Sequence, residues 1–184
     1  EDPEKSKHKV NFDNLTPLYP DRKFKMTMPS RRNTDSSLPA SHTAELTFIL
    51  PPDFNPRTQY PVWLRTYGGP HHPQVKNSWG SRMPDHLLAN LGIVVIVWDP
   101  RTASGYGAKS AWPAYKQLGV EETKDLESLC DWLQNQSWVD AQRIGLSGHS
   151  YGGYFTSYAM THSEKLCAGI AGAPVTDWAN YDTI

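Results

Sequence analysis

Residues 143–154 read RIGLSGHSYGGY, and this stretch decides the fold. A short apolar run leads into the pattern Gly-x-Ser-x-Gly, formed by Gly148, Ser150 and Gly152, and a helix-compatible stretch continues to about His162. A strand, a tight turn and a helix in this order build a nucleophile elbow, where flanking glycines avoid collisions with neighbouring backbone. We therefore predict that Ser150 is a catalytic nucleophile. The alternative is a glycine-rich turn that serves only the backbone conformation.

Further apolar runs on both sides of the elbow predict an α/β fold. The run GIVVIVWD at 92–99 is nearly continuous in β-branched residues, which suits a strand buried on both faces of a parallel sheet. A helix is expected between Glu121 and Gln136, because four apolar residues fall at helical spacing. These residues are Leu126, Leu129, Cys130 and Leu133. The other expected strands lie at 44–50, 60–66, 143–147 and 167–174. Strands that alternate with helices indicate a mostly parallel sheet with flanking helices.

Composition excludes several classes of protein. The 184 residues suit one domain, and 18 Lys and Arg against 19 Asp and Glu leave a formal net charge of −1. Such a balance gives no basic surface for nucleic acid or an anionic membrane. No apolar run approaches the roughly 18 residues of a membrane span, and the first residues, EDPEKSKHK, are too polar for a signal peptide.

The composition of the sequence changes near Ala44. Residues 1–43 are rich in Lys, Asp, Ser, Asn and Pro, so we expect an irregular N-terminal connecting segment there and a catalytic domain over 44–184. Cys130 and Cys167 fall in segments expected to belong to the core, which predicts two buried free thiols. Two cysteines could instead form a single disulfide, so their number does not indicate the redox compartment.

Acyl transfer at Ser150 requires donors for the negative charge of the tetrahedral intermediate. One is expected to be the backbone N–H of Tyr151, directly after the nucleophile. The second is expected to be the phenol of Tyr67, which follows the strand 60–66 and stays protonated at neutral pH. Functional groups gather at the carboxyl ends of strands in open α/β sheets, although residues 67–70, Tyr-Gly-Gly-Pro, could also be a plain strand-ending turn.

Neither His149 nor His162 is expected to supply the base. His149 is adjacent to Ser150 on the elbow, where neighbouring side chains project in different directions. His162 lies twelve residues along the following helix, roughly 18 Å away at 1.5 Å per residue. His71 and His72 have no carboxylate or cysteine cluster beside them in the sequence, so we expect no metal site, and no other cofactor.

Four segments together resemble the prolyl oligopeptidase family of serine peptidases, and most of all its dipeptidyl peptidase IV branch. They are Tyr67-Gly68-Gly69-Pro70, WDPRTASGYG at 98–107, GHSYGGY at 148–154 and AGAPVTDWANYD at 171–182. The resemblance covers about residues 44–184 and implies an α/β-hydrolase fold. It also implies that Ser150 is the nucleophile, with the Tyr67 hydroxyl and the Tyr151 N–H as oxyanion hole. By the same resemblance, an apolar S1 pocket for proline or alanine is lined by Tyr151, Val175, Trp178 and Tyr181.

Three departures from the family pattern accompany this resemblance. The loop Asp99–Gly105 is one residue longer than usual and has Pro100 in place of a glycine. The family's β-propeller, which holds a peptide's free amino terminus, is not in this sequence. The hydrolase order places an Asp and then a His after further strands, so we expect both beyond Ile184 and expect this stretch alone to be inactive.

Several functions remain open at this level. The favoured one is a dipeptidyl peptidase that acts on peptides through an acyl-enzyme. The alternatives are an endopeptidase or acylaminoacyl peptidase of the same family, a lipase or carboxylesterase, and a catalytically dead interaction module. Lipases and esterases usually build the oxyanion hole from a backbone loop, whereas Tyr67 stands here. The sequence does not decide whether the protein forms a homodimer. It does not decide the cellular compartment either, although export is favoured.

Overall fold

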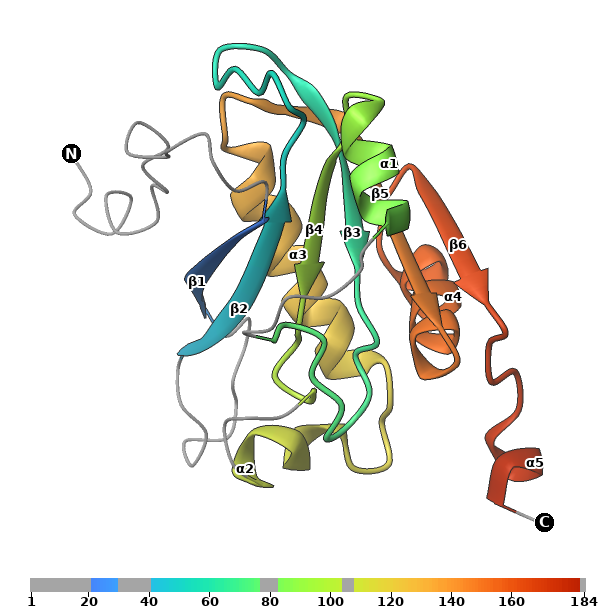
Figure 1. Ribbon diagram of the computed structural model, residues 1–184. Helices are drawn as coiled ribbons and strands as arrows, with labels where there is room; N and C mark the ends of the chain where they lie inside the picture. The colour runs from blue at the N-terminus through green and yellow to red at the C-terminus, as the bar shows by residue number, and fades with distance from the viewer. Residues whose placement is uncertain (1–20, 30–40, 77–82, 104–107, 183–184) are drawn as a thin grey trace.

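Six strands form one mixed sheet with helices on both faces (Figure 1). The computed structural model describes residues 21–29, 41–76, 83–103 and 108–182. The strands follow the spatial order β1-β2-β4-β3-β5-β6, in which β2 is antiparallel to both of its neighbours and β4, β3, β5 and β6 are parallel. Their bounds are β1 (Asp21–Pro29), β2 (Ser41–Ile49), β3 (Tyr60–Arg65), β4 (Val94–Trp98), β5 (Val139–His149) and β6 (Ala168–Gly172).

The sheet separates the core into two apolar layers, and each layer is covered by helices. On one face of the sheet, α3 and α4 cover a large apolar cluster that includes Ile96, Leu129 and Phe155. On the other face, α1 covers a smaller cluster that includes Val95 and Ala89. The helices are α1 (Met83–Asn90), α2 (Ala108–Ala111), α3 (Val120–Gln134), α4 (Tyr151–His162) and α5 (Trp178–Asp182), with a short 3₁₀ turn at Trp112–Ala114. Every residue of β4 is buried, because neighbouring residues of this strand face opposite layers.

The parallel strands place the loops that follow them at one end of the sheet. β3 and β5 are hydrogen-bonded neighbours with Arg65 opposite Ser147. Consequently the segments that follow them, which carry Tyr67 and Ser150, emerge side by side at the carboxyl edge. Among the described residues, no helix is both long and apolar enough to cross a membrane.

Two expectations from the sequence were wrong. Residues 21–29 form β1 and pair with β2, although this part of the chain was expected to be irregular. Cys167 is exposed, because it lies one residue before the edge strand β6, whose Ile170 is 62% exposed. Cys130 is buried as expected, and burial raises the pKa of its thiol to about 12, so this cysteine stays protonated and unreactive.

Candidate active site

Ser150 occupies the bend between β5 and α4. Its backbone has φ 59° and ψ −115°, a conformation that L residues with a side chain rarely adopt and that costs about 1–3 kcal/mol. The bend is held on both sides: the Ser150 N–H donates to the carbonyl of Gly172 at 2.9 Å, and the Ser150 carbonyl accepts from the N–H of Tyr154 at 3.0 Å. The strand, strained turn and helix predicted from the sequence are therefore confirmed.

The glycines beside Ser150 are required by close backbone contacts. A Cβ atom on Gly148 would lie 2.5 Å from the carbonyl group of Gly152. A Cβ atom on Gly152 would lie 2.6 Å from the carbonyl oxygen of Thr66 and 3.2 Å from the Cα of Tyr67. Any side chain at these two positions would force the backbone apart. The first turn of α4 therefore packs directly against the end of β3, where Tyr67 begins the next segment.

Tyr67 lies next to the residue that follows Ser150. Its ring centroid is 5.8 Å from that of Tyr151, and its ring also contacts His72 edge to face at 4.6 Å. Tyr67 and His149 both line a cavity of about 540 Å³ at this end of the sheet. The structure thus brings together, at the elbow, the two residues expected to form the oxyanion hole, Tyr67 and Tyr151.

The loop after β4 holds the Tyr67 segment in place. The Asp99 carboxylate accepts from the backbone N–H groups of Gln74 and Val75, each at 2.8 Å. The Thr102 hydroxyl donates to the carbonyl of Gly68 at 2.8 Å. Ser104 and Gly105 of the longer loop lie outside the described residues. The first half of this loop therefore ties down the backbone within the Gly-Gly-Pro turn, at Gly68, and after it, at Gln74 and Val75.

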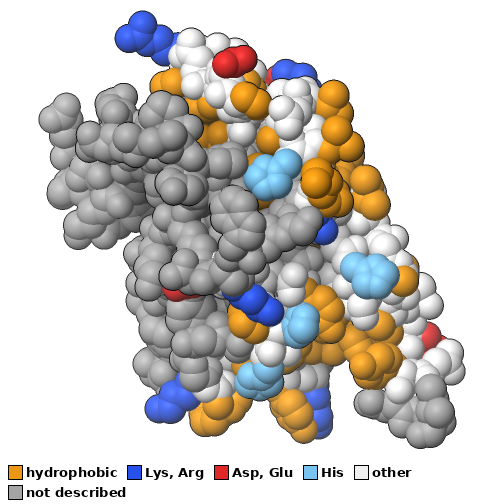
Figure 2. Space-filling view, viewed as in Figure 1, with side chains coloured by type: hydrophobic (Ala, Val, Ile, Leu, Met, Phe, Trp, Pro, Cys, Tyr) orange, Lys and Arg blue, Asp and Glu red, His pale blue; other side chains and the backbone are white. Residues whose placement is uncertain are grey.

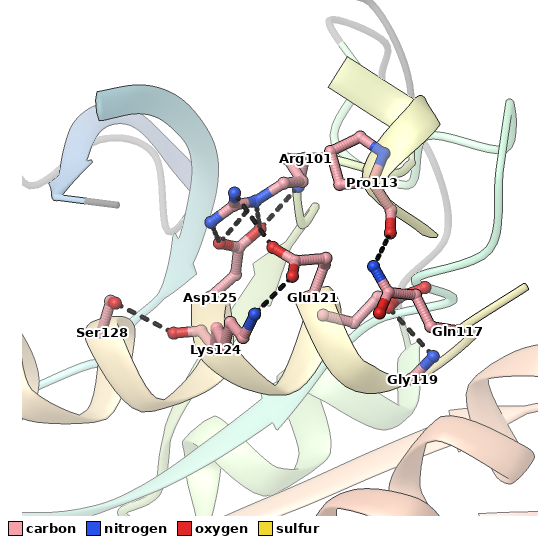
Figure 3. Close-up of polar contacts among 9 residues, drawn as sticks. Arg101, Pro113, Gln117, Gly119, Glu121, Lys124, Asp125 and Ser128 are labelled. Atoms are coloured by element: carbon pink, nitrogen blue, oxygen red, sulfur yellow. Dashed lines mark hydrogen bonds and ion pairs between the residues drawn. The ribbon is translucent and has the colours of Figure 1, made fainter. Parts of the chain in front are cut away.

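Arg101, in the same loop, anchors it to α3 (Figure 3). The Arg101 backbone N–H donates to the Asp125 carboxylate at 2.9 Å, and its guanidinium binds both oxygens of that carboxylate. A second acid of α3, Glu121, approaches the guanidinium at 3.2 Å and also pairs with Lys124. Asp125 is fully buried and Arg101 nearly so, so this ion pair is shielded from solvent.

We expect Asp125→Ala to lower the free energy of unfolding by about 3–5 kcal/mol, because it leaves the buried guanidinium without its main partner. Urea unfolding measures this loss. The control is Asp140→Ala, which breaks an ion pair with the exposed Arg143 and should cost far less. Equal losses in the two variants would show that the Arg101 pair contributes no more than a surface pair.

Aromatic side chains surround Tyr151 on the other side. The centroid of the Trp178 ring is 5.7 Å from that of Tyr151 and 5.5 Å from that of Tyr181. Tyr154, which the sequence analysis did not single out, contacts Trp178 edge to face at 5.1 Å. The feature of the sequence that could have identified Tyr154 is its position one helical turn after Tyr151. Val175 is half-buried in the segment between β6 and α5, and Tyr181 is 62% exposed.

A groove of about 850 Å³ continues from this cluster. Trp178 and Tyr154 line it together with three further aromatic side chains, Trp112, Tyr115 and Tyr158. Both Trp112 and Tyr115 are well exposed. Figure 2 shows apolar side chains beside histidines on the face that it draws, and the charged side chains among its coloured residues are scattered. The chemistry of this region suits an apolar part of a ligand.

The phenol of Tyr151 is anchored inside the protein. Its hydroxyl donates to Glu122 Oε1 at 2.6 Å, and Glu122 Oε2 accepts from the N–H of Gly119 at 3.0 Å. Burial raises the pKa of Tyr151, and the charge and hydrogen bond of Glu122 raise it further. Burial also raises the pKa of Glu122, against the opposing effect of the Tyr151 hydrogen bond. Tyr151 therefore remains a protonated donor at neutral pH.

Two titratable side chains that follow Ser150 in the sequence make contacts away from its hydroxyl. His162 lies in the last turn of α4, where its ring stacks on Tyr158 at 3.9 Å and its Nδ1 is 2.9 Å from the Tyr158 carbonyl. Asp177 accepts from the N–H of Ala179 and from the Asn180 side chain at the start of α5. Across the described ranges, no three His, Cys, Asp or Glu side chains gather as a metal site would require.

Comparison with known proteins agrees with this arrangement. The model of the prolyl oligopeptidase family matches residues 79–184, more than half of the chain. The chain belongs to this family. Its relatives include dipeptidyl peptidase 4 of Trichophyton equinum, 33% identical over 80% of this chain and 20% of that protein. Prolyl endopeptidase FAP of Bos taurus is 34% identical over 74% of this chain and 18% of that protein.

A solved structure supports the same fold. The crystal structure of Porphyromonas gingivalis dipeptidyl peptidase 4 matches with a TM-score of 0.74 and 32% identity, over 87% of this chain and 22% of that chain. The sheet order, the antiparallel second strand and the elbow are those of an α/β-hydrolase. The chain spans about a fifth of the length of these two curated relatives.

Proposed function

We propose that this chain is part of the catalytic domain of a serine peptidase that removes dipeptides with proline or alanine in second position. The observation that carries the proposal is Ser150 on a strained elbow, with Tyr67 packed against the same turn. The family membership and the dipeptidyl peptidase relatives support it. The family-like segment with Tyr67 also speaks against a lipase, which usually builds its oxyanion hole from a backbone loop.

In the proposed reaction, Ser150 Oγ attacks the carbonyl carbon of the scissile peptide bond and gives its proton to a general base. The carbonyl oxygen becomes an oxyanion that accepts hydrogen bonds from the Tyr151 N–H and the Tyr67 hydroxyl. Collapse of this intermediate breaks the C–N bond, and the amine leaves with a proton. Water then attacks the acyl-enzyme in the same way and releases the dipeptide.

The rings around Tyr151 are proposed to bind the residue before the scissile bond. Proline has an apolar ring and no N–H, so aromatic walls such as Tyr151, Trp178 and Tyr181, with Val175, suit it. We also propose that the full-length protein supplies the triad Asp and His from outside residues 1–184, because Asp177 and His162 make other contacts. We further propose that the full-length protein contains a β-propeller, which holds the free amino terminus of the peptide. We also propose that it forms a homodimer.

The test uses the full-length protein that contains this chain. We expect it to hydrolyse a Gly-Pro chromogenic amide faster than a butyrate ester, and a fluorophosphonate probe to label the tryptic peptide that carries Ser150. An N-acylated Gly-Pro amide is the control for exopeptidase action, and it should be a poor substrate. Preference for the ester would favour an esterase, and efficient cleavage of the blocked amide would favour an endopeptidase.

A further inference from the structure

Glu122 is a buried carboxylate with no part in the reaction described above. It lies in the first turn of α3, and its side chain is fully inaccessible to solvent. A buried carboxylate is costly unless hydrogen bonds satisfy it. Here each oxygen accepts one: Oε1 accepts from the Tyr151 hydroxyl and Oε2 accepts from the N–H of Gly119. The second bond belongs to the start of the helix, whereas the first reaches a residue 29 positions away.

Tyr151 is held at two ends. Its backbone lies in the first turn of α4 directly after Ser150, and its phenol ends at Glu122. Between these points the ring packs against Tyr67 at 5.8 Å and Trp178 at 5.7 Å between centroids. A shift of the Tyr151 ring would therefore move its contacts with both the second proposed oxyanion donor and the proposed S1 wall.

We propose that Glu122 is a positioning residue, whose carboxylate fixes the Tyr151 phenol and thereby the geometry of the oxyanion hole and the S1 wall; this inference rests on the proposed function. The competing explanation is that Glu122 serves only the start of α3 through Gly119. The two explanations differ in which partner matters, because Tyr151→Phe removes one hydrogen bond of Glu122 and leaves the other.

The experiment is a double-mutant cycle in the full-length protein, with Glu122→Gln, Tyr151→Phe and the double variant. For the Gly-Pro amide we expect each single variant to lower kcat by about 10- to 100-fold, because small displacements of catalytic groups have effects of this size. In the Tyr151→Phe background, the further effect of Glu122→Gln should be under about threefold. The exposed Glu164 gives the control Glu164→Gln, which should keep the wild-type kcat.

The outcomes separate the possible failures. If the wild-type protein does not hydrolyse the amide, the proposed function itself is wrong. If the wild type is active but Glu122→Gln lowers kcat equally in both backgrounds, Glu122 acts without Tyr151 and the inference is overturned. If Glu122→Gln does not fold, Tyr151→Phe decides alone, since a wild-type kcat in that variant also overturns the inference. Thermal melting of each variant shows that its kcat describes folded protein.

Discussion

Ser150→Ala in the full-length protein should lower kcat for a Gly-Pro amide by about 10⁶-fold, the size of loss found when a triad nucleophile is removed. The physical reason is that no other side chain replaces the covalent acyl-enzyme, and what remains is binding and the oxyanion donors. Active-site titration and steady-state kinetics measure the loss. Alanine lacks only the hydroxyl, so the hydrogen bonds of the residue 150 backbone with Gly172 and Tyr154 stay in place.

A serine on the same helix provides the control. The Ser157 hydroxyl donates to the carbonyl of Gly153 at 3.1 Å and takes no part in the proposed reaction. Ser157→Ala should therefore keep the wild-type kcat. If Ser150→Ala retained more than about a tenth of the wild-type rate, the assignment of Ser150 as nucleophile would be wrong.

Tyr67→Phe should lower kcat by about 10²- to 10³-fold, with little change in KM, because one oxyanion donor is worth this much in the transition state. The phenylalanine ring can keep the packing against Tyr151 and His72, so folding should be preserved. Stopped-flow or steady-state hydrolysis of the Gly-Pro amide measures the effect, and circular dichroism checks the fold.

Tyr60 provides a matched control at the opposite end of β3. Its hydroxyl accepts from the N–H of Asn55 at 3.0 Å, far from the elbow along the strand. Tyr60→Phe should leave kcat unchanged. A Tyr67→Phe variant with wild-type kcat would mean that the second donor of the oxyanion hole is a different group.

The parts of the fold that could be predicted are those with a strong local pattern. The continuous β-branched run of β4 and the helical spacing of the apolar residues of α3 identify these elements within a few residues. The elbow was predictable because Gly148 and Gly152 are needed wherever a serine is placed on such a turn. The alternation of Phe24, Met26 and Met28 with polar residues was a signal for β1 that we did not use.

Other features depend on contacts that are distant in sequence. The eight-residue helix α1 has few apolar residues on one face, and its buried Asp85 is balanced by Arg65 of β3. The bond between Glu122 and Tyr151 joins two helices, and no spacing in the sequence indicates it. Tyr67 and Tyr151 could be brought together by reasoning only because parallel neighbouring strands end at the same edge.

The hydrogen bond from the Ser150 N–H to the Gly172 carbonyl has a consequence for the order of events during synthesis. The bend at residue 150 is strained, and a partner that lies 22 positions later in the chain helps to hold it. A nascent chain that has left the ribosome only as far as α4 therefore lacks one of the restraints on its reactive hydroxyl. Docking of β6 therefore adds a restraint to the bend, and we expect Ser150 to become reactive later still, once the proposed general base from outside residues 1–184 is in place.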